Sequence, residues 1–248
     1  MLKKIVSLMI VGFMSMGMCG CQSTQSTKKT NILIATSPDY PPYESLDSGN
    51  KMVGFDIDLA KELIKIMNKN GGNYSYTFKQ MSFDTISSSI ISGQVDLGIA
   101  GFSYHKEYNV GWSHKYNSSK SVALVNADSS IQSVSDLKGK KIGAQLGTTQ
   151  SDDAKKVKGA KVTTVKDAKV LVETLKAGGL DAVILDDAVA ENYVKTNGMK
   201  IATGALNEEG KWIITQKGNT KLLKPLDKAI DEFVKSSKYK ELKQKWAC

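Results

Sequence analysis

The order of apolar segments in the first third of the chain is the feature that most constrains its fold. A buried-strand run at 31–36 is followed by an amphipathic helix at 55–67, an alternating strand at 74–79, a helix at 83–91 and a strand at 95–99. This β-α-β-α-β order is the pattern of a doubly wound α/β domain. We therefore predict that the chain begins with such a domain.

A similar order returns further along the chain. The strand at 121–125 leaves the first domain, and three later strands alternate with helices, at 141–145, 162–165 and 181–185. These elements predict a second, smaller α/β domain. A strand at 211–216 and closing helices at 221–235 and 239–246 complete the predicted elements.

The amino terminus has the layout of a secretory signal peptide. Two lysines precede the apolar run Ile5–Met18, which is too short to span a bilayer comfortably. The run ends in Met-Cys-Gly-Cys, which resembles a bacterial lipobox with Cys21 as the acceptor. We predict a signal peptide at 1–20, lipidation of Cys21 and a polar tether at 21–30. The alternative is an ordinary signal peptide with an incidental cysteine.

Composition argues against nucleic acid, metal and cofactor partners. The net charge is +9, but all 34 basic residues are lysine. Recognition of nucleic-acid bases and bidentate binding of phosphates depend mainly on arginine. Cleavage before Cys21 would leave only Cys21 and Cys248, and the chain has two histidines, His105 and His114. We expect no disulfide framework, no zinc or copper site and no cofactor.

Polar and aromatic residues gather in one loop after the third strand. Small residues, among them Ala100 and Gly101, end that strand, and Ser103 to Tyr108 follow directly. Open α/β sheets bind ligands at the carboxyl ends of their strands, so we predict a site here. An ordinary polar loop is the alternative. His105 has no evident orienting acid in the sequence, and we expect no catalytic residues.

Two further segments have side chains suited to a ligand. Prolines fix the loop at 37–44, so Tyr40 and Tyr43 could stack on a ligand, although one of them could simply pack under the loop. The turn at 147–150 opens a helix, whose free N–H groups suit an anion.

Two acids end a buried strand in the second domain. Asp186 and Asp187 follow the strand at 181–185 and precede a helix predicted at 188–195. Either acid could hold a cation or cap that helix, and the two could divide these roles.

The mature region resembles the extracellular solute-binding family 3 of polar amino-acid ABC importers, over essentially its whole length. The strongest match is G-F-D-I-D-L-A-K-E-L at Gly54–Leu63. Supporting matches are Y-P-P-Y at 40–43, G-K-K-I-G at 139–143, G-T-T-Q at 147–150, A-V-I-L-D-D at 182–187 and Y-K-E-L-K-Q-K-W at 239–246. Each is weak alone, and together their order and spacing are specific.

The resemblance implies a type-II periplasmic-binding-protein fold, with two α/β lobes joined by two crossing segments around a ligand cleft. Lobe 1 would be discontinuous, at 31–117 plus 205–248, and lobe 2 would cover 118–204. The implied function is a monomeric, membrane-tethered receptor outside the cell that delivers its ligand to an ABC permease. A dehydratase-like enzyme on the same fold and a receptor for a sensor protein are the alternatives.

The resemblance also implies ligand contacts. Tyr40, Tyr43 and Phe83 would flank the ligand, and Ala100, Gly101 and Ser103 would meet its polar head. Thr149 would donate to an α-carboxylate and Asp186 would accept from an α-amino group, as a helix N-terminus and a buried acid allow. Ser37 and Thr148 complete the predicted set.

One departure from the family pattern concerns the ligand's carboxylate. The family's arginine after the Ser103 position, which grips that carboxylate, has no counterpart, because the chain contains no arginine. An ungapped alignment puts Tyr108 there, and an earlier gap puts Lys106 there. Lysine would keep the positive charge but lose the pair of parallel hydrogen bonds that arginine makes to a carboxylate, and tyrosine would lose both. The predicted ligand is an amino acid or a similar small zwitterion.

Overall fold

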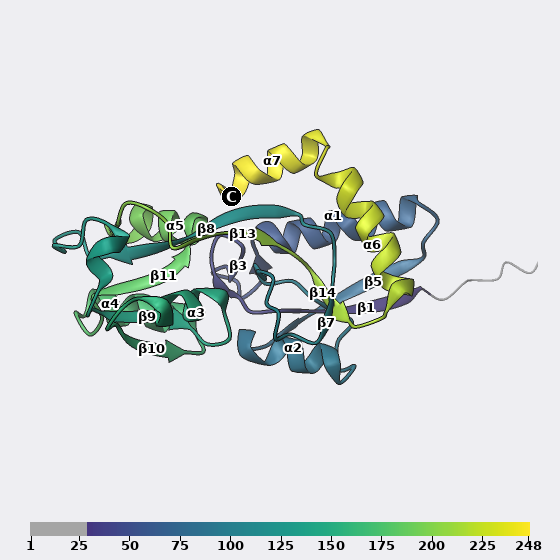
Figure 1. The fold of residues 1–248 in the computed structure, drawn as a ribbon. Helices are drawn as coiled ribbons and strands as arrows, with labels where there is room; N and C mark the ends of the chain where they lie inside the picture. The colour runs from purple at the N-terminus through teal and green to yellow at the C-terminus, as the bar shows by residue number, and fades with distance from the viewer. Residues whose placement is uncertain (1–28) are drawn as a thin grey trace, which may run out of the picture.

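The computed structural model describes residues 29–248, so the predicted signal peptide and Cys21 lie outside it, with most of the predicted tether. Two main sheets lie side by side (Figure 1). The first has five strands, in the order β5 (Tyr74–Gln80), β1 (Thr30–Thr36), β6 (Leu97–Gly98), β14 (Ile214–Gln216) and β7 (Val110–Trp112). We call the part built on this sheet the first lobe.

Helices pack on the first sheet because each has one apolar face. They are α1 (Phe55–Lys69), α2 (Phe83–Ile91) and α6 (Thr220–Phe233), while α7 (Ser237–Trp246) packs against α1. In α1, Leu59, Leu63 and Met67 are buried in the largest hydrophobic cluster. The segment that follows β1 forms a small three-stranded sheet. Its strands are β2 (Asp39–Tyr40), β3 (Glu44–Leu46) and β4 (Met52–Val53).

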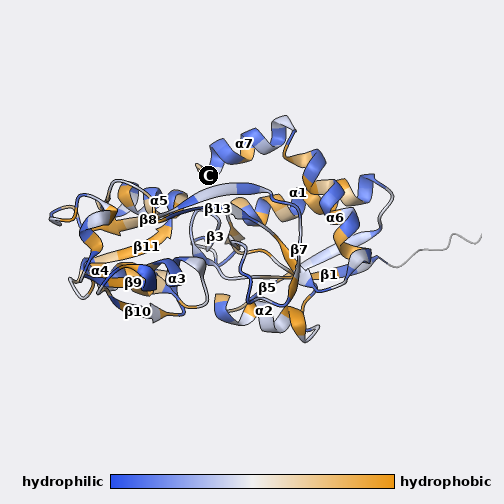
Figure 2. Cartoon of the chain, in the orientation of Figure 1, coloured by the Kyte–Doolittle hydropathy of each residue, from blue (hydrophilic) through white to orange (hydrophobic). Residues whose placement is uncertain are grey.

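The second sheet forms the core of the second lobe. Its strand order is β10 (Lys161–Val165), β9 (Lys141–Gln145), β11 (Ala182–Asp186), β8 (Asn117–Val125) and β12 (Lys200–Ile201), and β13 (Asn207–Lys211) also pairs with β8. Around it lie α3 (Thr149–Lys156), α4 (Ala168–Lys176), α5 (Asp187–Asn197) and the 3-10 turn Val134–Leu137. Every residue of β11 is buried, as its unbroken apolar run implies. Figure 2 shows β11 as mainly hydrophobic.

Two strands connect the lobes. The antiparallel pair β8 and β13 runs in register from Asn117 opposite Lys211 to Ser121 opposite Asn207, and Figure 1 shows it passing between the two halves. The architecture is therefore two α/β lobes joined by two crossing segments, and the predicted fold class is confirmed. The lobe boundaries predicted above, 31–117 plus 205–248 and 118–204, stay a proposal.

The strand predicted at 211–216 is wrong as a single element. It is two strands, β13 ending at Lys211 and β14 beginning at Ile214, with Trp212 and Ile213 between them. The break has a physical reason, because β13 pairs with β8 of the second sheet whereas β14 pairs with β6 and β7 of the first. An apolar run in the sequence indicates a buried strand, but it does not indicate which neighbouring strand each half of the run pairs with.

Gly54 places α1 against the loop that holds Tyr43. Its φ is 140°, and an added Cβ would lie 2.1 Å from the carbonyl oxygen of Tyr43. We expect Gly54→Ala to lower the free energy of unfolding by about 3 kcal/mol or more, measured by urea denaturation, because a strained backbone and a backbone clash combine. Gly71→Ala is the matched control, since φ there is 95° and the space is open. Equal losses in both variants would contradict this prediction.

Candidate functional site

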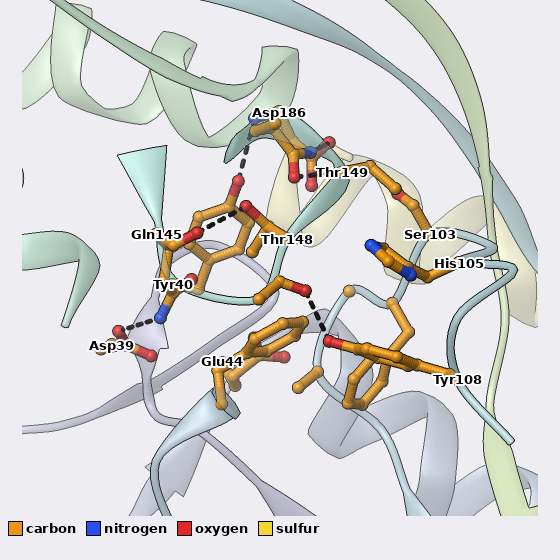
Figure 3. Close-up of a pocket in the computed structure, with 16 residues that line it drawn as sticks. Asp39, Tyr40, Glu44, Ser103, His105, Tyr108, Gln145, Thr148, Thr149 and Asp186 are labelled. Carbon is orange, nitrogen blue, oxygen red and sulfur yellow. Dashed lines mark hydrogen bonds between the residues drawn. The ribbon is translucent and has the colours of Figure 1, made fainter. Parts of the chain in front are cut away.

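A cavity lies between the two lobes, at the carboxyl ends of strands from both sheets (Figure 3). Its volume is about 20 Å³, room for a single water molecule. A larger ligand therefore requires the lobes to move apart. The lining residues are Asp39, Tyr40, Glu44, Phe83, Ala100, Gly101, Phe102, Ser103, His105, Tyr108, Gln145, Gly147, Thr148, Thr149, Gln150 and Asp186.

The structure brings most of the predicted ligand contacts to this cavity. Those that line it are Tyr40, Phe83, Ala100, Gly101, Ser103, Tyr108, Thr148, Thr149 and Asp186. Three others do not. Ser37 donates a 2.7 Å hydrogen bond to Asp39, and Tyr43 is fully buried with its ring edge-on to Phe55. The side chain of Lys106 is 84% exposed and its Nζ lies 3.8 Å from Glu107. The ligand roles of all twelve residues stay predictions.

Tyr108 spans the gap between the lobes. Its hydroxyl donates to the carbonyl oxygen of Gly147, ahead of α3 (Figure 3), and its ring stacks on His105 with centroids 4.7 Å apart. Burial raises the pKa of Tyr108 to about 12, so the phenol is neutral at physiological pH. In the ungapped alignment, the position of the family's arginine therefore holds a neutral group whose hydroxyl proton already makes a hydrogen bond.

His105 has an acid partner that sequence reasoning missed. Its Nε2 lies 3.1 Å from Oδ2 of Asp152 on α3, and its side chain is only 15% exposed. The acid belongs to the other lobe and lies 47 positions away, so no local pattern could have predicted it. The pair is a second bond between the loop after β6 and the start of α3.

Further hydrogen bonds join the lobes on the opposite wall of the cavity (Figure 3). The backbone N–H of Asp186 donates to the hydroxyl of Tyr40 over 2.9 Å. Asp39 accepts from Nε2 of Gln145 and from the backbone N–H of Ala168, both over 2.8 Å. The prolines around Tyr40 thus hold an aromatic residue that contacts the second lobe directly.

The two acids at the end of β11 have different partners. Asp187 Oδ1 accepts from the backbone N–H of Ala188 at the start of α5, over 2.9 Å. The side chain of Asp186 makes no capping bond and is 1% exposed. It accepts instead from Ser119 Oγ at 2.8 Å and Gln150 Nε2 at 2.9 Å. Asp186 is also paired with a positive charge, and that charge is on a side chain of the protein itself.

Lys211 is that cation. Its side chain is fully buried at the end of β13, and its Nζ lies 2.7 Å from Oδ2 and 2.8 Å from Oδ1 of Asp186. It also donates to Ser103 Oγ at 2.8 Å and lies 3.8 Å from Oε2 of Glu209. Sequence reasoning assigned Lys211 no role, because nothing in its neighbours distinguishes it from the other lysines.

Glu44 and Asp56 form a buried acid pair beside the cavity. Burial is the main cause that raises both pKa values, that of Glu44 well above its ordinary range and that of Asp56 to about 6. Asp56 accepts from the backbone N–H of Gly101 at 2.8 Å and from the hydroxyl of Tyr116 at 2.9 Å, and these bonds favour its charged form. We infer that the pair shares one proton, which Glu44 carries and donates to Asp56.

Residues 29–248 contain no group of three or more histidine, cysteine or acidic side chains arranged to hold a metal ion. Across the same residues, no helix is long and apolar enough to cross a membrane.

The profile of the bacterial extracellular solute-binding proteins, family 3, matches residues 32–247. The chain belongs to this family. It is 32% identical to the arginine-binding extracellular protein ArtP of Bacillus subtilis (strain 168), over 99% of this chain and 98% of that protein. As a family member it has the type-II periplasmic-binding-protein fold and a solute-binding role, and proteins of the family work outside the cytoplasm.

Solved structures of the same family superpose on most of the chain. An ancestral arginine-binding protein bound to arginine matches with a TM-score of 0.80 and 36% identity, covering 88% of this chain and 98% of its own. The ancestral amino acid-binding protein AncCDT-1, described as a precursor of cyclohexadienyl dehydratase, matches with a TM-score of 0.79 and 28% identity, covering 87% and 95%.

The shared proton of Glu44 and Asp56 predicts a pH dependence of stability. Because both pKa values are raised on folding, the folded protein keeps protons that the unfolded chain releases. The stability from this source is fully present below about pH 4, and it is lost as the pH rises through about 6 for Asp56 and at higher pH for Glu44. We expect Glu44→Gln, which keeps a neutral donor, to reduce the loss between pH 5 and pH 8 by at least about 1 kcal/mol in urea titrations.

The matched control is Glu173→Gln, because the Glu173 side chain is 67% exposed. This variant should keep the wild-type difference between the two pH values. A wild-type protein whose stability is the same at pH 5 and pH 8 would contradict the shared proton.

Proposed function

We propose that this protein captures an amino acid, or a similar small zwitterion, by closing its lobes, and delivers it to an ABC permease. The observation that carries the proposal is the cavity between the lobes, walled by aromatic rings from the first lobe and by the start of α3 from the second. A ligand in this position contacts both lobes, so its binding favours the closed form.

The wall of the cavity suits the two ends of a zwitterion. The first N–H groups of α3 lie beside Gly147, Thr148 and Thr149, where they can receive a carboxylate. Tyr40 and Phe83 offer apolar faces, and buried acids lie opposite. The names of the relatives agree with this class, since ArtP and the ancestral protein are both described as binding arginine.

Calorimetry with the twenty amino acids tests the proposal. We expect tight binding of at least one, and native mass spectrometry should recover that compound unchanged, as expected for a receptor that catalyses no reaction. Tyr108→Phe should weaken binding about fivefold, because closure loses one neutral hydrogen bond of about 1 kcal/mol. Lys106→Met should bind as the wild type does, since Lys106 faces solvent.

Two results would count against this. If no amino acid binds, the ligand class is wrong, and if a bound amino acid is converted into another compound, the protein is an enzyme. A large loss in Lys106→Met with normal binding by Tyr108→Phe would move the role of the missing arginine to Lys106.

We further propose that the protein is a lipoprotein anchored through Cys21 to the outer face of the cell membrane and acts as a monomer. The support is the sequence Met-Cys-Gly-Cys at the end of the apolar leader, followed by nine residues without an apolar side chain. A tether of this kind lets an anchored receptor reach a permease in the same membrane.

Cys21→Ala tests the anchor. Without the acceptor thiol, the protein should appear in the medium or remain as an unprocessed precursor, as judged by cell fractionation and mass. Cys248→Ala is the matched control and should stay in the membrane fraction. A lipid-labelled, membrane-bound Cys21→Ala protein would contradict the assignment.

A further inference from the structure

The buried acid Asp186 is the natural place in this cleft for a ligand's ammonium group, and the protein has already filled it. Asp186 accepts from Lys211, Ser119 and Gln150 through Oδ1, and Lys211 lies 2.7 Å from Oδ2. Oδ2 is buried, accepts no hydrogen bond from residues 29–248 and lies beside the Lys211 ammonium. A ligand ammonium at Oδ2 would therefore compete with another positive charge for this oxygen.

Lys211 has its closest contacts within this cluster. Its ammonium donates to Asp186 Oδ1 and to Ser103 Oγ, and Glu209 Oε2 lies 3.8 Å away. Its side chain is fully buried in the closed cleft. A buried charge is retained only when it is paired, which makes separating Lys211 from Asp186 unfavourable.

We propose that Lys211 is a specificity-determining residue that takes the place of a ligand's ammonium group beside Asp186. The inference rests on the proposed receptor function and changes the expected ligand at one point, its α-amino group. The cleft favours ligands whose amino group is absent or substituted over α-amino acids that present a free ammonium at this point.

The charges in the cleft support this assignment. Tyr108, at the arginine's position in the ungapped alignment, is neutral, and Lys106 of the same loop faces solvent. The one lysine ammonium among these contacts comes from β13 and faces Asp186. A zwitterion would be bound by the family's arginine at its carboxylate and by Asp186 at its ammonium. In the ungapped alignment the arginine is replaced by the neutral Tyr108, and Asp186 is paired with Lys211.

The test measures a preference rather than a single affinity. Calorimetry would compare L-arginine with 5-guanidinopentanoate, and L-glutamine with 4-carbamoylbutanoate, since each pair differs only in the α-amino group. In the wild type we expect the des-amino compound to bind at least as well as the amino acid. In Lys211→Met the preference should shift toward the amino acid by at least tenfold, because Asp186 becomes free to accept an ammonium.

Three variants control for charge and folding. Lys243→Met makes the same substitution on α7, where the ammonium bonds Asn117, and should keep the wild-type preference. Lys211→Gln serves if Lys211→Met does not fold, because it removes the charge and keeps a donor. Asp186→Asn combined with Lys211→Met removes both charges of the ion pair and should lose the tenfold shift.

The outcomes separate this inference from the proposed function. A shift that appears in Lys211→Met or Lys211→Gln and disappears with Asp186→Asn supports the role of Lys211. If the wild type binds an amino acid of the pairs and neutral variants show the same preference, the inference is overturned and the receptor assignment stands. If neither wild type nor neutral variants bind any of the four compounds, the inference is overturned, and the panel of twenty amino acids decides the proposed function.

Discussion

The ion pair between Lys211 and Asp186 joins the parts of this protein that form the cleft. Lys211 ends the second crossing strand, and Asp186 ends the central strand of the second sheet. Ser119 of the first crossing strand and Gln150 of α3 donate to the same carboxylate. Because a buried charge must be paired, the position of these four elements relative to one another is fixed around one ammonium group.

This constraint also explains where the protein can bend. Between the last residue of β13 and the first of β14 the chain passes from one sheet to the other through Trp212 and Ile213. Lys211 moves with the second lobe, because its strand pairs with β8 and its ammonium is bonded to Asp186. Its bond to Ser103 reaches across to the first lobe. Opening of the cleft therefore strains that bond before it strains the ion pair.

Local patterns in the sequence predicted most elements, and long-range pairing decided what they missed. The helix α2 has the predicted bounds, and α1 extends two residues further than predicted, because apolar periodicity is a property of the segment itself. The break after Lys211 and the pairing of His105 with Asp152 depend on residues far away in the chain. Nine of the twelve predicted ligand contacts line the cavity because motifs at strand ends and helix starts mark the edges of a cleft. Lys211 could not be found this way, since its partner is set by the crossing of two strands.

The contacts across the closed cleft reflect the same replacement of charges. A cleft with an unpaired arginine and an unpaired aspartate would remain solvated until a zwitterion neutralised both. Here Tyr108 donates to Gly147, and the Lys211 ammonium lies against the Asp186 carboxylate. The neutral hydrogen bonds between the lobes each contribute about 1 kcal/mol net, which allows closure and still permits opening. A ligand must then compete with contacts that the protein makes with itself, and only groups left free by those contacts can determine which ligand is bound.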